Sequence, residues 1–145
     1  MKFKTLLTAS LLTIVLMGAC TSGNDDKNIF GKWSFKTLDG KYAELWTDDD
    51  ALLTVREGSS TPYIFDYQQN GDTIIIYQYG QNGEKAFELD RFLLEKSKDE
   101  QVTILQDTVH NTLSLISDKI DNIQNTEAYR TAAYEEFEQR ATQAK

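Results

Sequence analysis

Few side chains in this sequence of 145 residues could carry acid–base or nucleophilic chemistry. The chain has a single histidine, His110, and a single cysteine, Cys20, so it cannot build a His-rich or Cys-rich metal site. A Ser-His-Asp triad could draw on His110, which we expect in a turn over 107–111, but no Gly-x-Ser-x-Gly segment is present. We therefore predict that the protein is not an enzyme and that it has no cofactor.

Two groups of acidic residues could do other chemistry. Glu88 and Asp90 lie two apart on one expected strand face, where a buried pair could act as acid and base, although a solvated face would look the same. Asp48-Asp49-Asp50 could bind a hard cation through carboxylate oxygens. This segment lacks the spaced ligands and the glycine of a calcium loop, so we interpret it as a charged turn and predict no metal site.

A set of aromatic residues is better suited to binding. Tyr63, Phe65 and Tyr67 repeat with period two on one expected strand. Tyr77 and Tyr79 do so on the next, so we expect the two sets to face each other across a sheet. Tyrosine combines an apolar ring with a polar tip, which suits the wall of a cavity for a partly polar ligand. The alternative is that these rings only fill the core.

Strands must position these side chains, because residues 33–117 consist of short β-favouring runs broken by turn residues about every ten positions. Sequential antiparallel strands with short connections close most simply into an up-and-down barrel, which leaves no free edge. We predict a mainly β fold in which residues 29–117 form such a barrel. The eight expected strands are Trp33–Leu38, Lys41–Trp46, Ala51–Arg56, Tyr63–Gln68, Thr73–Tyr79, Ala86–Glu95, Val102–Gln106 and Thr112–Ser117.

Two details of these strands are specific enough to test. Asp39-Gly40 separates the first two runs and favours a tight hairpin with positive φ. On the sixth run, alternation places Phe87, Leu89 and Leu93 on the buried face, because successive side chains of a strand point to opposite sides.

The composition changes after residue 117. Residues 118–145 contain neither glycine nor proline and are rich in helix formers, so we predict a C-terminal helical segment. Ile120 and Ile123 form one apolar stripe, and Tyr129, Ala133, Phe137 and Ala141 form another that points elsewhere, so we expect a kink near residues 125–126. An alternative starts the helix at Val109, but the Thr, Ser and Asn content of 111–117 favours a strand.

The N-terminus has the features of a bacterial export signal. A basic start, an uncharged run from Leu6 to Met17 and the small pair Gly18-Ala19 predict a signal peptide over residues 1–19. The segment Leu16 to Cys20 resembles the lipobox of bacterial lipoproteins, which implies acylation of Cys20 and a membrane anchor that occupies its thiol. Residues 20–28 are polar and predict a flexible tether, in which Asp25-Asp26 is similar to an export signal of surface lipoproteins.

A second resemblance concerns the first strand. Gly31-Lys32-Trp33 is similar to the Gly-x-Trp signature of lipocalins. The resemblance implies that Gly31 and Trp33 close one end of an eight-stranded barrel and that the protein binds a small apolar or amphiphilic molecule. The ligand-binding residues would then include Tyr63, Phe65 and the other aromatic residues of the set. The alternative is a protein-binding module, such as a lysozyme-type hydrolase inhibitor or an accessory protein of a surface complex.

The charge balance narrows the choice of partners. The sequence has 15 basic and 23 acidic residues, a formal net charge of −8. Loss of residues 1–19 would remove Lys2 and Lys4 and no acid, which moves the charge to −10. Such a chain disfavours nucleic acid and favours a basic protein partner. We expect the protein in the bacterial cell envelope, anchored through Cys20 to the outer membrane on its periplasmic or surface face.

Overall fold

The computed structural model describes residues 29–78, 87–96, 101–106 and 109–144. The predicted signal peptide, the tether with Cys20, and Tyr79 lie outside these residues. Within them the chain forms eight strands followed by one helix, as predicted. The strands are β1 (Gly31–Lys36), β2 (Tyr42–Thr47), β3 (Ala51–Arg56), β4 (Tyr63–Asn70), β5 (Thr73–Tyr77), β6 (Glu88–Lys96), β7 (Val102–Gln106) and β8 (Val109–Ser117), and the helix is α1 (Glu127–Gln143).

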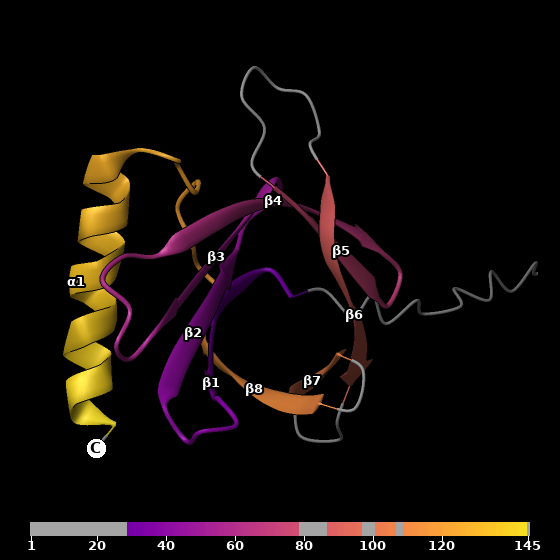
Figure 1. Ribbon diagram of the computed structural model, residues 1–145, viewed down its shortest axis with the longest axis horizontal. Helices are drawn as coiled ribbons and strands as arrows, with labels where there is room; N and C mark the ends of the chain where they lie inside the picture. Colours follow the sequence, from indigo (N-terminus) through magenta and orange to yellow (C-terminus); the bar gives the residue numbers. More distant parts are fainter. Residues whose placement is uncertain (1–28, 79–86, 97–100, 107–108, 145) are drawn as a thin grey trace, which may run out of the picture.

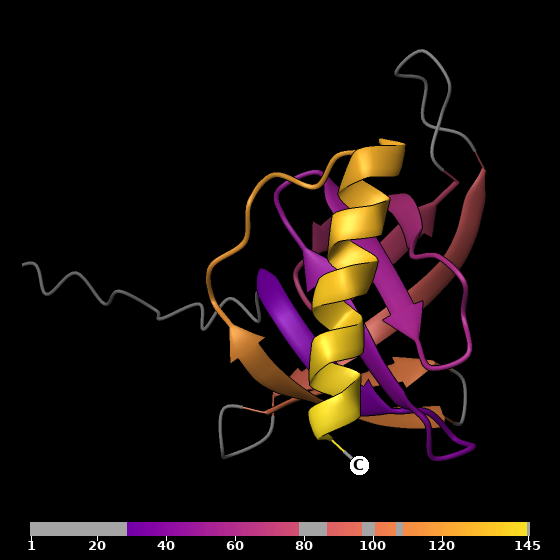
Figure 2. The same ribbon diagram turned by 90° about the vertical axis from the view of Figure 1, so that its left-hand side faces the viewer.

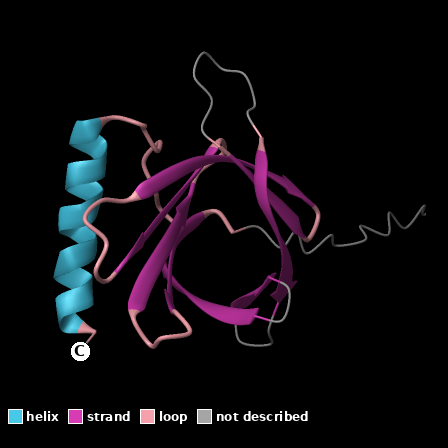
Figure 3. Cartoon of the chain, in the orientation of Figure 1, coloured by secondary structure: helices cyan, strands magenta, loops and turns pink. Residues whose placement is uncertain are grey.

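The strands form a closed barrel in sequence order, each antiparallel to the next, and β8 pairs with β1 to complete the ring (Figure 1). Closure satisfies the backbone groups that an open meander would expose on its two outer strands. The helix lies outside the ring, against the wall that contains β2 and β3 (Figure 3). The predicted up-and-down barrel with a C-terminal helix is therefore confirmed.

The hairpin at Asp39-Gly40 is confirmed, but the first strand ends two residues earlier than expected, at Lys36, and the second begins one residue later, at Tyr42. Gly40 has a φ of +79°, in the left-handed region that glycine tolerates. The Thr37 hydroxyl donates to Asp39 and accepts the N–H of Lys41, which closes the turn before residue 38 can pair. The carboxylate of Asp39 accepts hydrogen bonds from the Thr37 hydroxyl and from the Lys41 ammonium, and these bonds, in that order, lower the pKa of Asp39 to about 2.

Residues 109–117 form a strand, so the alternative of an early helix is wrong. The strand begins three residues before the predicted start, because Val109 and His110 pair with Gln106 and Leu105. His110 accordingly lies in β8 and not in a turn, and its side chain is exposed.

Two apolar clusters hold the fold together, one inside the barrel and one between the barrel and α1. Residues alternate between them along β2 and β3, so these two strands are buried on both faces. The inner cluster contains Ile29, Trp33, Leu45, Leu52, Ile74, Ile76, Leu94, Val102, Ile104 and Leu113. The outer cluster contains Trp46, Ala51, Leu53, Val55, Ile64, Ile123, Ala133, Phe137 and Ala141.

The helix covers the wall with the predicted stripe. Ala133, Phe137 and Ala141 are buried at a spacing of four residues, and the ring of Phe137 stacks on that of Tyr42 with centroids 5.7 Å apart. Figure 2 shows α1 crossing the outer face of the strands. The side chain of Thr126 accepts the N–H of Tyr129 and caps the first turn.

The prediction of a helix over residues 118–126 is wrong, and no kinked first half exists there. These residues form an irregular connection from β8 to α1. Ile123 is buried in the outer cluster, and its N–H donates to the carboxylate of Asp48 instead of to a helical carbonyl. The spacing of Ile120 and Ile123 thus reflects packing of an extended segment on the barrel, and the helix begins only after its Thr126 cap.

Candidate functional site

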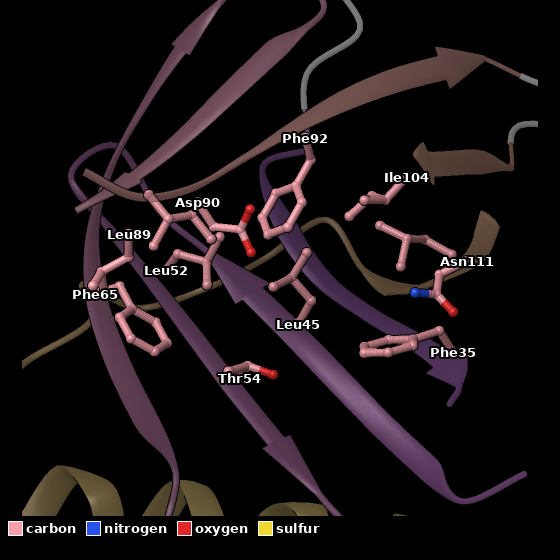
Figure 4. A pocket seen from close by; sticks show the side chains of 12 residues that line it. Phe35, Leu45, Leu52, Thr54, Phe65, Leu89, Asp90, Phe92, Ile104 and Asn111 are labelled. Carbon is pink, nitrogen blue, oxygen red and sulfur yellow. The ribbon is translucent and has the colours of Figure 1, made fainter. Parts of the chain in front are cut away.

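The barrel encloses a cavity of about 350 Å³, which lies at the small end of the range for ligand pockets. Its wall is mainly apolar, with three polar side chains, and most of its residues are labelled in Figure 4. The lining consists of Phe35, Leu45, Leu52, Thr54, Phe65, Ile76, Leu89, Asp90, Phe92, Ile104, Asn111 and Leu113.

The cavity lies toward one end of the barrel. Because adjacent strands are antiparallel, β1, β3, β5 and β7 all finish at the same end of the barrel, which we call the open end. Phe35 and Thr54 are near the last residues of β1 and β3, and Asp90 and Asn111 are near the first residues of β6 and β8. These four lining residues therefore all belong to the half of the barrel nearer the open end.

A second hollow of about 370 Å³ continues toward this end and shares Phe35 and Thr54 with the cavity. Two large apolar side chains next to strand ends at the open end are exposed, Leu38 after β1 at 81% and Phe87 before β6 at 80%. Tyr63, which lines the second hollow, is 56% exposed. The open end thus presents apolar groups, and the second hollow also has polar lining residues, among them Arg56.

A β-bulge on β6 decides which carboxylate faces the cavity. Tyr77 pairs with Glu88, whereas Ile76 pairs with Asp90, so Leu89 is an extra residue on β6. Asp90 therefore shares the inner face with Ile76, and Glu88 lies outside, where Arg91 donates to it at 3.1 and 3.2 Å. The sequence placed Glu88 and Asp90 on one face, and the bulge separates them.

The same bulge corrects the predicted face of the sixth strand. Phe92 lines the cavity and Leu94 is buried in the inner cluster, whereas Leu93 points outward and is 47% exposed. Leu89 borders the cavity from the bulge itself. Alternation counted from Phe87 predicts the wrong faces, because Leu89 on β6 is not paired with a residue of β5. This extra residue moves each later side chain of β6 to the opposite face.

Asn111 and Thr54 are the other polar residues of the cavity. Asn111 pairs with Ile104, so both point inward from β8 and β7. Figure 4 shows the carboxylate of Asp90 and the amide of Asn111 on different sides of the cavity. Neither Asn111 nor Thr54 was predicted as a site residue. Only one sequence signal could have identified them: each is a polar residue at a strand position where alternation places the inner face, whose other residues are mainly apolar.

The predicted aromatic set is divided by the structure. Phe65 lines the cavity, Tyr63 stands nearer the open end, and Tyr67 packs against the inner cluster with its hydroxyl donating to the carbonyl of Asp48. Tyr67 pairs with Ile76. Tyr77 therefore pairs with Asp66 on the opposite face and does not face the other three rings.

The end opposite the cavity is closed by the start of β1. Trp33 is buried, and its Nε1–H donates to the carbonyl of Ile29 at 2.7 Å. The Thr47 hydroxyl donates to the same carbonyl. Gly31 has a φ of +118°, and a Cβ there would lie 2.5 Å from the carbonyl oxygen of Ser117. Glycine is thus required where β1 passes β8.

Asp48 lies at this closed end, and hydrogen bonds occupy its carboxylate. One oxygen accepts the N–H groups of Asp50 and Ala51 at 2.9 and 2.7 Å, and the other accepts the N–H of Ile123. The interpretation of the three aspartates as a turn is confirmed. Over the described ranges, no group of three or more His, Cys, Asp or Glu residues could hold a metal ion.

A buried ionic cluster lies between the barrel and α1, away from the cavity. Glu44 on β2 is fully buried, and it accepts hydrogen bonds from the Tyr42 hydroxyl and the Trp46 indole at 2.7 Å each. Arg140 donates to both its oxygens. Burial opposes the charge of Arg140, but hydrogen bonds to Glu44 and Glu136 raise its pKa further above the ordinary value.

Lys32 extends this cluster along the helix. Its ammonium donates to Glu136 at 2.7 and 2.9 Å and lies 4.1 Å from the centroid of the Trp46 ring. Glu136 also accepts a hydrogen bond from Arg140 at 2.6 Å. Each charge in the cluster has an opposite partner, which identifies it as the attachment of the helix rather than as a reactive site.

No protein-family model matches this chain, and neither a curated protein nor a solved structure does. In the part of the chain that the structure describes, no helix is both long and apolar enough to cross a membrane.

Proposed function

We propose that this protein is a lipid-anchored, lipocalin-like binding protein of a bacterial cell envelope. It takes a small apolar or amphiphilic molecule into its barrel and acts by binding rather than by catalysis. The observation that carries the proposal is the cavity of about 350 Å³ inside a closed eight-stranded barrel, with an apolar lining. Barrels of this size either fill their interior with side chains or hold one small ligand.

The two ends of the barrel support this function in different ways. At one end Trp33 and Ile29 are buried at the start of β1, in the position that the Gly-x-Trp resemblance implies. At the other end the exposed side chains of Leu38, Tyr63 and Phe87 offer an apolar surface to an approaching ligand. A molecule would enter between them and leave its polar end near the solvent.

The N-terminal sequence supports the anchor. Cys20 ends the lipobox-like segment, and eight residues, seven of them polar, separate it from Ile29, where the described residues begin. Two or more acyl chains give stable membrane attachment, because each buried methylene contributes about 0.8 kcal/mol. Mass spectrometry of the protein extracted from membranes tests this directly. The expected N-terminus is an acylated Cys20, and an unmodified thiol would contradict the anchor while leaving the binding proposal open.

Binding is tested on the processed chain, residues 20–145, with Cys20→Ser to remove the anchor. The probe is N-phenylnaphthylamine, whose fluorescence rises in an apolar site, and decanol is the competitor. We expect saturable binding of the probe and its displacement by decanol. Absence of both would contradict the proposed function.

Two matched substitutions locate the site. Thr54→Phe places a ring in the cavity and should weaken binding of the probe about tenfold or more. His110→Phe places the same ring on the exposed outer side of β8 and should leave binding unchanged. Equal effects of the two substitutions would mean that the probe binds somewhere other than the cavity.

A further inference from the structure

We infer that the barrel takes amphiphiles with an anionic oxygen head, a carboxylate or a phosphate, and that Arg56 at the open end binds this head. This inference rests on the proposed function and adds the chemical class of the ligand. It is carried by the different linings of the two hollows. The inner cavity is mainly apolar, whereas the second hollow, toward the open end, is lined by Arg56 together with several hydroxyl groups.

Strand β3 places Arg56 at the mouth of the barrel. Leu52 and Thr54 line the inner cavity from this strand, and alternation puts Arg56, two residues later, on the same inner face. Arg56 is the last residue of β3 and pairs with Ala43, which also lines the second hollow. Its side chain is exposed, so a ligand head can reach it from the solvent without any opening of the barrel.

The guanidinium of Arg56 has hydrogen-bonding capacity for a ligand. Among the residues that the structure describes, none forms an ion pair with it or accepts a hydrogen bond from it. A guanidinium carries five N–H donors, arranged as a fork that matches two oxygens of a carboxylate or a phosphate. Tyr63 on β4 pairs with Thr54 and lines the same hollow, so its hydroxyl can donate a further hydrogen bond to the head.

The acidic residues next to the second hollow have partners elsewhere. The described residues that line this hollow include no aspartate or glutamate. Asp39, in the turn after β1, forms an ion pair with Lys41 at 2.9 Å. Glu57 directly follows Arg56 and alternates to the outer face, where its carboxylate accepts the N–H of Tyr42 at 3.0 Å. The local charges therefore favour an anion at Arg56.

Two negative contributions oppose an anion and determine where its charge must stay. Asp90 lines the inner cavity but not the second hollow, so a head drawn into the cavity would come close to this carboxylate. Like charges repel strongly in an apolar surrounding. The net charge of −8 acts over longer distances, which salt screens beyond about 8 Å. Phe35 and Thr54 line both hollows, so the head can remain at Arg56 while the alkyl chain fills the cavity.

The test compares three molecules with the same alkyl chain: decanoate, decyl phosphate and decanol. Each is titrated by calorimetry at neutral pH, below its micelle concentration, into the processed chain and into its Arg56→Gln and Lys36→Gln variants. The processed chain should bind at least one of the two anions about fivefold more tightly than decanol, and the tighter anion identifies the head. Arg56→Gln keeps a polar side chain and removes the charge, so that anion should lose about fivefold in affinity and decanol should change little.

Lys36→Gln is the matched control. Lys36 is the last residue of β1, at the same end of the barrel, and it lies on the outer face opposite Tyr42 of β2. The substitution also removes one positive charge and should leave the order of the three affinities unchanged. An equal loss of anion binding in both variants would assign the effect to net charge and overturn the role of Arg56. Decanol binding as tightly as both anions would also overturn the inference but leave the proposed function intact. If none of the three bound, the proposed function itself would fail.

Discussion

The guanidinium of Arg140 donates two hydrogen bonds, at 2.8 and 2.7 Å, to the fully buried carboxylate of Glu44. The two residues are separated by 96 positions in the sequence, and they join the C-terminal helix to strand β2. A buried pair with two parallel hydrogen bonds has a defined geometry, so it fixes where α1 lies on the barrel wall.

Removal of one partner should therefore be costly. Arg140→Met leaves Glu44 buried without a cation and is expected to lower the free energy of unfolding by about 3 kcal/mol, measured by urea denaturation. A second substitution, Glu44→Gln, should recover part of this loss because it removes the unpaired charge and keeps a side chain that Tyr42 and Trp46 can contact. No recovery in the double variant would contradict the account of the pair.

The exposed pair formed by Arg91 and Glu88 is the control for that measurement. Their side chains are 57% and 44% exposed, so water screens the interaction. Arg91→Met should change the free energy of unfolding far less than Arg140→Met does.

The attachment of the helix should also weaken in acid. Burial alone would raise the pKa of Glu136, but the hydrogen bonds and charges of Lys32 and Arg140 hold it below its ordinary value of 4.5. A carboxylate with a lowered pKa in the folded state stabilises the fold above its ordinary pKa, and this contribution is lost as the pH falls through the lowered value. Glu136→Gln should thus destabilise the protein at neutral pH, and its difference from the wild type should shrink below about pH 4.

Urea denaturation of both proteins at neutral and acidic pH measures this difference. Glu135→Gln removes an exposed carboxylate next to Glu136 and controls for the change in net charge. If the difference between the wild type and Glu136→Gln stayed constant with pH, the ionic contacts of Glu136 would not contribute to stability.

In alkali, the side chain of Tyr67 should contribute to unfolding. Burial, followed by the charges of Asp48, Asp49 and Asp50, raises the pKa of Tyr67 to about 12. Burial likewise raises the pKa of Tyr129 to about 12. A tyrosine that ionises at a higher pH in the folded chain than in the unfolded chain leaves stability unaffected below its ordinary pKa of 10.0. Above that pH the unfolded state gains, and stability falls up to about pH 12.

Tyr67→Phe separates this effect from that of the other tyrosines. The substitution should cost about 1 kcal/mol at neutral pH, because it removes the hydrogen bond to the Asp48 carbonyl. It should also make the loss of stability above pH 10 less steep without abolishing it, since Tyr129 remains. Thermal unfolding of both proteins at several pH values above 10 measures this loss. If stability fell equally steeply with pH in the wild type and in Tyr67→Phe, Tyr67 would ionise at the same pH in the folded and the unfolded chain.

The start of β1 should not tolerate a side chain at Gly31. Gly31→Ala combines a φ of +118° with a Cβ only 2.5 Å from a backbone oxygen, so β1 or β8 must shift. Gly40→Ala meets a positive φ of +79° but open space, which makes it a matched control at about 1 to 2 kcal/mol. Gly31→Ala should cost clearly more in urea denaturation, and equal costs would mean that the contact with Ser117 is easily relieved.

The barrel was predictable because its local rules agree. Alternating apolar residues and turn-forming glycines repeat along residues 31–117, and each strand pairs with its neighbour in sequence. Trp33 and Phe65 could be placed inside from period two alone. The same rule failed on β6, because the bulge at Leu89 depends on pairing with β5, which no local pattern of residues 86–95 specifies.

The parts that depend on distant contacts were not predictable. Glu44 lies on the outer face of a strand, where a charge would normally be solvated, and it is buried only because α1 returns to cover it. Ile120 and Ile123 have a helical spacing, yet Asp48 takes the N–H of Ile123. Asp90 became a cavity residue through the bulge, so its place in the site could not be assigned from the sequence.

The most direct test of the account is a crystal structure of the processed chain grown with bromodecanol, in which the anomalous signal of bromine locates the end of the alkyl chain. The account predicts bromine among Leu45, Leu52 and Leu113 inside the barrel. Bromine bound only on the outer surface, or an empty cavity at a saturating concentration of the alcohol, would contradict it.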